Sequence, residues 1–124
     1  MPYICDTNVI LYHLRDEEAV RTFIDERLDS PFPLYLSVVS ETELLRWPQL
    51  PDEEEAAILE LLPIFSIVPL DSNLARKAGR IGRLYNLKLG DSIIAATAQF
   101  TGSILVTRNV RDFKRVPDLH IQPI

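Results

Sequence analysis

The sequence contains one cysteine, Cys5, two histidines and no hydrophobic run near the roughly 20 residues that cross a membrane as a helix. A single cysteine excludes an intrachain disulfide and makes a reducing cytoplasm the expected location. His13 and His120 have no second histidine or cysteine at ligand spacing, so a zinc site and a histidine-based catalytic triad have no support. The N-terminus lacks a basic segment followed by an apolar stretch, so we expect no signal peptide.

A glycine-rich loop is also missing after the first expected strand, so a nucleotide-binding fold is not supported. What is present is ordinary globular composition, with 124 residues of which 47% are hydrophobic and 25% are charged. This length and composition predict one domain over residues 1–124.

Charge is distributed unevenly along the chain, whose formal net charge is −5. Residues 16–60 carry thirteen acids and three arginines, whereas residues 76–115 carry nine bases and only the acids Asp91 and Asp112. The net acidity argues against a generic nucleic-acid-binding protein. The basic C-terminal part is compatible with binding a polyanion, although a solvated helix face is the commoner reason for such a pattern.

Apolar runs without clean alternation predict strands that are covered on both faces. These runs are Tyr3–Cys5, Leu34–Val39, Phe65–Pro69, Ile104–Thr107 and a short stretch near His120–Gln122. Helical patterns fall between them, at Glu17–Leu28, Asp52–Leu62, a segment that starts after Asp71-Ser72-Asn73 and ends near Tyr85, and Asp91–Ala98. The alternation predicts an α/β fold with a parallel sheet, in which ligands bind beyond the carboxyl ends of the strands.

Four acidic residues follow expected strands or open expected helices, namely Asp6, Glu43, Asp91 and Asp112. A parallel sheet would bring all four to the same rim, where they would repel one another unless a cation neutralised them. Carboxylate oxygens select Mg²⁺ or Mn²⁺, and such ions chiefly serve phosphate chemistry.

Each acid also has a purely structural explanation. Asp6 could cap a local turn, Glu43 could close a capping box with Ser40, and Asp91 could complement a helix dipole. Asp112 could be a turn residue before Phe113. Asp71 is placed similarly at a strand end, but the adjacent Ser72-Asn73 makes a helix cap the better explanation, so we leave it outside the site.

The ordered set of motifs is more specific than any one of them. It comprises Asp6-Thr7-Asn8, Ser37-Val38-Val39 leading to Glu43-Leu44, Asp91-Ser92-Ile93-Ile94-Ala95-Ala96-Thr97-Ala98, and Leu105-Val106-Thr107-Arg108-Asn109 with Asp112-Phe113. With these motifs the sequence resembles the PIN domain family over essentially its whole length. More narrowly, it resembles the VapC-type toxins of bacterial and archaeal toxin–antitoxin pairs.

The resemblance implies a three-layer α/β sandwich with a five-stranded, mostly parallel sheet, and a Mg²⁺- or Mn²⁺-dependent endoribonuclease. It makes Asp6, Glu43 and Asp91 the core metal ligands, with Asp112 as the fourth acid. Asn109 stands where some members of the family carry an acid, which is a departure from their pattern. Asn8, Thr107 and Asn109 would orient ligands or water, and the implied reaction is in-line hydrolysis of an RNA phosphodiester.

Basic residues of the C-terminal part would steer RNA toward this acidic site. Arg76, Arg80 and Arg83 fall at i, i+4 and i+7, so they form one stripe on a helix. The other candidates are Arg108, Arg111, Lys114 and Arg115. For any single one of them, a solvated surface position is an equally good interpretation.

The partners that the resemblance implies are an RNA substrate, a second copy of the chain and a small antitoxin. The segments Glu17–Leu28 and Asp52–Leu62 could bound an antitoxin groove or could simply cover the core. Two other functions stay open. One is a PIN-like RNA- or protein-binding module whose chemistry is eroded, as Asn109 suggests; the other is a nuclease of DNA or flap substrates, which the absence of threading insertions disfavours.

Overall fold

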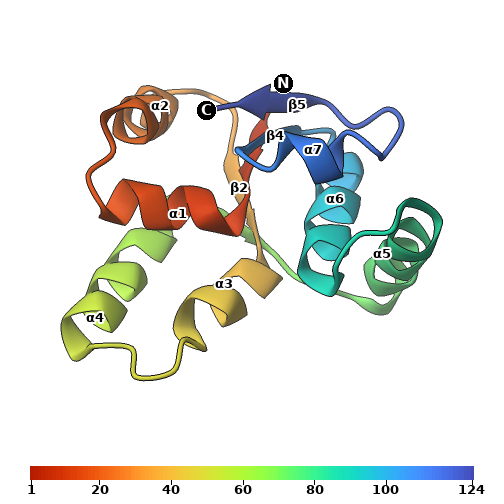
Figure 1. Cartoon of the computed structure of the whole chain (residues 1–124). Coiled ribbons are helices and arrows are strands. Elements are labelled where there is room, and N and C mark those ends of the chain that lie inside the picture. Colours follow the sequence, from red (N-terminus) through yellow and green to blue (C-terminus); the bar gives the residue numbers. More distant parts are fainter.

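The computed structural model describes residues 1–124 and contains one five-stranded sheet flanked by helices (Figure 1). The strands are β1 (Tyr3–Cys5), β2 (Leu34–Ser37), β3 (Ser66–Val68), β4 (Ile104–Thr107) and β5 (Ile121–Pro123). The helices are α1 (Thr7–Leu14), α2 (Glu18–Leu28), α3 (Val38–Leu45), α4 (Asp52–Leu61), α5 (Ser72–Tyr85), α6 (Leu89–Thr101) and α7 (Val110–Phe113), with a 3₁₀ turn η1 (Leu62–Ile64). No helix has the length and apolar content needed to cross a bilayer.

The strand order is β3-β2-β1-β4-β5, and every neighbouring pair is parallel. The sheet was expected to be mostly parallel, and the structure shows that it is parallel throughout. Ile4 of β1 pairs with Tyr35 of β2 on one side and with Leu105 of β4 on the other. The chain therefore runs outward in one direction from β1 to β3 and in the other direction from β4 to β5, which makes the boundary between β1 and β4 the topological switch point.

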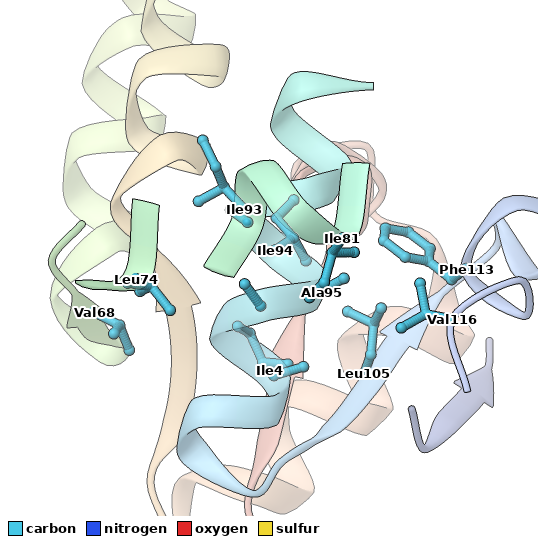
Figure 2. Packing of buried hydrophobic residues seen from close by; sticks show 13 residues of the cluster. Ile4, Val68, Leu74, Ile81, Ile93, Ile94, Ala95, Leu105, Phe113 and Val116 are labelled. Atoms are coloured by element: carbon cyan, nitrogen blue, oxygen red, sulfur yellow. The ribbon is translucent and has the colours of Figure 1, made fainter. Parts of the chain in front are cut away.

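Two hydrophobic layers cover the two faces of the sheet, as Figure 1 shows with α1, α2 and α4 on one side and α5 and α6 on the other. Side chains of each strand alternate between the layers. Ile4 and Leu105 lie on the face covered by α5 and α6, where they belong to one cluster with Ile94 of α6 and with Phe113 (Figure 2). Cys5, in contrast, belongs to the cluster on the opposite face. The strands are apolar without alternation because both of their faces are buried.

Two helices, α1 and α3, begin within two residues of the end of a strand, and neither was among the predicted helical segments. The strand predicted over Leu34–Val39 ends at Ser37, and α3 begins at Val38, because the Ser37 hydroxyl accepts a 3.2 Å hydrogen bond from the Val39 amide and caps the helix. Similarly, α1 begins one residue after Asp6, so Val9 and Ile10 reach the core from a helix.

The short helix α7 was not predicted, and the other elements lie close to their predicted positions. The Asp71 carboxylate accepts a 2.8 Å hydrogen bond from the Leu74 amide, which confirms that Asp71 caps α5. Helices α5 and α6 end at Asn86 and Gly102, whose backbones are left-handed. Helix α6 begins at Leu89 rather than at Asp91, so Asp91 lies in its first turn.

Candidate active site

Asp6 and Thr107 meet at the switch point of the sheet. Asp6 follows β1 directly, and Thr107 is the last residue of the neighbouring strand β4. The Thr107 hydroxyl donates a 2.7 Å hydrogen bond to Oδ2 of Asp6, and it accepts a 2.9 Å bond from the Asn109 amide. Thr107 is fully buried and Asp6 is 6% exposed, so this contact holds a carboxylate at the edge of the core.

Local capping does not explain Asp6. It occupies the N-cap position of α1, but its side chain makes no capping hydrogen bond. Burial raises the pKa of its carboxyl group, the Thr107 hydroxyl opposes that rise, and the charge of Glu43 adds to it. A buried carboxylate with an acidic neighbour and no cation is costly, which favours a cation-binding role.

Glu43 approaches Asp6 from α3. Oε1 of Glu43 accepts a 2.7 Å hydrogen bond from the Thr7 hydroxyl, and Thr7 lies 2.7 Å from the Ser40 hydroxyl. The capping-box alternative for Glu43 is wrong, because Ser37 caps α3 and Ser40 lies inside the helix. A methyl group on Gly90 would lie 2.7 Å from Oε2 of Glu43, so the glycine leaves room for this carboxylate.

Asp91 and Asp112 complete the acidic group from α6 and α7. The Asn109 side-chain amide lies 3.4 Å from Oδ2 of Asp91 and 3.2 Å from Oδ2 of Asp112, and donates to both. Asp112 also forms a 3.0 Å ion pair with Arg115. Burial and the charges of Asp6, Glu43 and Asp112 together raise the pKa of Asp91 to about 6, against the opposing charge of Lys88.

All four acids line one cleft of about 880 Å³, which we call the acid cleft. Asn8 and Asn109 line it as well, whereas Thr107 lies behind Asp6. Its wall extends over α1, α3 and α4, with apolar side chains of Leu11, Leu14, Leu44, Trp47, Leu50 and Ile58. Of the two segments expected to bound a groove, α4 therefore lines the cleft and α2 does not.

The donor set fits a hard divalent cation, since it consists of carboxylates alone and the raised pKa of Asp91 records their repulsion. No three histidine, cysteine or acidic side chains of the chain enclose a single point at metal-ligand distance in this structure. The fit therefore rests on the chemistry and the convergence of the donors at one cleft.

The structure separates the predicted RNA-binding arginines from the acid cleft. Arg76 and Arg80 line a different cleft on α5, and Arg83 lines a third hollow. Arg108 forms a 2.7 Å ion pair with Glu17 and lies 4.0 Å from the ring centre of Tyr12, and Arg111 is exposed on α7. The cations that line the acid cleft are Arg15, Arg46 and Lys88, which the sequence analysis did not select because they belong to no periodic pattern.

Comparison with known proteins is consistent with this geometry. Residues 3–119 match the PIN domain family. Ribonuclease VapC10 of Mycobacterium tuberculosis (strain ATCC 25618 / H37Rv) is 35% identical over 116 residues, which cover 89% of this chain and 84% of the relative. The structure of VapBC2 from Rickettsia felis, bound to a DNA fragment from its promoter, superposes with a TM-score of 0.86 at 18% identity and covers 100% of this chain and 99% of the neighbour, which shows a shared fold. A toxin-antitoxin complex from Klebsiella pneumoniae superposes with a TM-score of 0.79 at 25% identity and covers 94% of each chain.

Proposed function

Because this chain belongs to the PIN domain family, we propose that it is a metal-dependent endoribonuclease that hydrolyses RNA phosphodiester bonds and acts as the toxin of a toxin–antitoxin pair. The observation that carries the proposal is the convergence of Asp6, Glu43, Asp91 and Asp112 on one cleft at the switch point of a parallel sheet. Four like charges in one cleft are expected of a cation site and are unfavourable without one.

Asp6, Glu43 and Asp91 would hold a Mg²⁺ or Mn²⁺ ion, with Asp112 as a further ligand. When bound, such an ion lowers the pKa of water and offsets negative charge on phosphoryl oxygens. The residues of this chain hold the carboxylate ligands in position. Thr107 fixes Asp6 and Thr7 fixes Glu43, each through a 2.7 Å hydrogen bond, so that two carboxylates are oriented before any ligand arrives.

The partners are proposed from the surfaces around the site. An antitoxin segment would contact the apolar wall of the acid cleft, where Trp47 is 68% exposed, and would bring basic side chains to the acids. A second copy of the chain would cover part of the α5–α6 surface, where Leu70 is 38% and Leu89 is 80% exposed. An RNA substrate and the single buried Cys5 agree with a location in the cytoplasm.

The direct test is cleavage of a mixed pool of structured RNAs by purified protein with Mn²⁺ or Mg²⁺. Cleavage should vanish when EDTA is added and should vanish in Asp6→Asn. Asp29→Asn, an exposed acid outside the cleft, is the matched control and should cut like the wild type. If the wild type binds Mn²⁺ in calorimetry but cuts no RNA, the ribonuclease proposal fails; if it binds no metal, a binding module without chemistry becomes the better interpretation.

A further inference from the structure

A second cleft of about 540 Å³ lies between the N-terminal half of α5 and the C-terminal end of α6, beside the end of β3. It shares no lining residue with the acid cleft. The residues that matter for its chemistry are Arg76, Lys77, Arg80 and Phe100, with Asp71 and Asn73 at the N-terminus of α5. We call it the Phe100 cleft.

The net charge of the Phe100 cleft is positive, because three cations and one acid, Asp71, line it. Arg76, Lys77 and Arg80 are exposed on one helix. None of them forms an ion pair, since the three ion pairs of the chain involve Arg21, Arg108 and Arg115. The acid at this cleft, Asp71, already accepts a hydrogen bond from the Leu74 amide. Like charges at i and i+4 disfavour a helix, so this arrangement has a cost that an anionic ligand would remove.

Phe100 adds an aromatic face to these cations. Its side chain is 64% exposed, although it lies only two residues beyond the buried run of α6 from Ser92 to Ala98. A large exposed aromatic ring beside three cations is the combination that single-stranded nucleic acids recognise, because the bases stack on the ring while the phosphates pair with the cations. The cleft volume lies within the range of about 300–1,000 Å³ that is typical of sites for one small ligand.

We propose that the Phe100 cleft binds a single-stranded segment of RNA, with a base stacked on Phe100 and the backbone phosphates paired with Arg76, Lys77 and Arg80. The inference rests on the proposed function, since it takes RNA to be the substrate. A duplex would hide the faces of its bases, so single strands are favoured. The site is separate from the acids, and therefore it contributes to the choice of RNA rather than to the cleavage step.

The test is binding of a fluorescein-labelled pool of short single-stranded RNAs to the full chain in EDTA, followed by fluorescence anisotropy at several salt concentrations. Phe100→Leu should weaken binding about fivefold or more, and Phe100→Tyr should restore it. The double change Arg76→Gln with Arg80→Gln should make the slope of log K against log salt shallower by about 1.4. Arg21→Gln, which changes an exposed arginine on α2 that lines neither this cleft nor the acid cleft, is the control and should leave the Phe100 contribution unchanged.

Three results would overturn the proposal. These are a failure of the pool to bind the wild type, binding of Phe100→Leu as tight as that of the wild type, and a loss of binding in Arg21→Gln as large as in the double change. A poly-glutamate peptide that competes with RNA equally in the wild type and in Phe100→Leu would instead indicate an acidic protein partner. Cleavage is measured separately with Mn²⁺: loss of cleavage with intact Phe100-dependent binding contradicts the ribonuclease proposal alone, whereas intact cleavage without such binding contradicts this site alone.

Discussion

Asp6 and Glu43 share one cleft with Asp112 but are held by a different kind of partner. Asp6 and Glu43 each accept a 2.7 Å hydrogen bond from a threonine hydroxyl. Asp112 accepts a hydrogen bond from the side-chain amide of Asn109 and forms an ion pair with Arg115 at 3.0 Å. A hydroxyl orients a carboxylate without bringing a charge to it, whereas a guanidinium also offsets part of its charge.

Within the site, some carboxylates are only held in position, and one also has its charge partly offset. Asp6 and Glu43 are oriented and form no ion pair in the chain, so a bound cation would meet no competing cationic partner. Asp112 already has a cationic partner in Arg115, although that pair is partly exposed and therefore weak. Asp6 and Glu43 should accordingly contribute more to metal binding and cleavage than Asp112 does.

The largest expected effect is on cleavage. Asp6→Asn should lower the initial rate by about 100-fold or more, because a metal site supplies several kcal/mol and each tenfold change in rate corresponds to about 1.4 kcal/mol. Asp112→Asn should lower the rate only about tenfold, since Arg115 already offsets this charge. Rates are compared at equal protein concentration, with circular dichroism as the control for folding. Equal losses in both variants would contradict the division between the two kinds of acid.

The next effect is on stability and concerns Thr107. Thr107→Val removes the donor to Asp6 and the acceptor of the Asn109 amide, and it leaves a buried carboxylate without its hydroxyl partner. The free energy of unfolding of the metal-free protein, measured by urea titration, should fall by about 1–3 kcal/mol.

Thr107→Ser is the matched control, because it keeps the hydroxyl and should lose less stability than the valine variant. If valine were tolerated as well as serine, the hydrogen bond to Asp6 would not be what positions this carboxylate.

The sequence predicted the strands well where both faces are buried. Tyr3–Cys5 and Ile104–Thr107 were predicted with their observed bounds, because a short apolar run closed by a polar residue has few alternatives. The helix after β2 was misjudged, since Val38 and Val39 are β-branched and continue the strand pattern. The signal that ends the strand is the Ser37 cap, a single hydrogen bond that periodicity does not reveal.

The candidate site was predictable as a set of acids and less so as a geometry. Position after a strand or at the start of a helix was enough to bring Asp6, Glu43, Asp91 and Asp112 to one cleft. For the arginine stripe, in contrast, the sequence did not predict the location in the fold. Spacing at i and i+4 places Arg76 and Arg80 on one face of α5, but it does not say which cleft that face borders, and the structure puts them beside Phe100.

The smallest effect is the pH dependence of the metal-free protein, which tests the repulsion at Asp91. Burial, together with Asp6, Glu43 and Asp112, raises the pKa of Asp91 from 3.8 to about 6. The folded state therefore binds the proton more tightly than the unfolded state does. The contribution of this group to stability is greatest below pH 3.8 and is lost as the pH rises through about 6.

Asp91→Asn carries no such charge, so in EDTA its melting temperature should exceed that of the wild type at pH 7.5 by a few degrees, and the difference should shrink at pH 4.5. Asp29→Asn, which changes an exposed acid outside the cleft, should follow the wild type at both pH values. A saturating concentration of Mn²⁺ should reverse the order at pH 7.5, because a ligand of the folded state stabilises only the protein that binds it. If Asp91→Asn and the wild type melt in parallel across this range, the four carboxylates do not act as one electrostatic site.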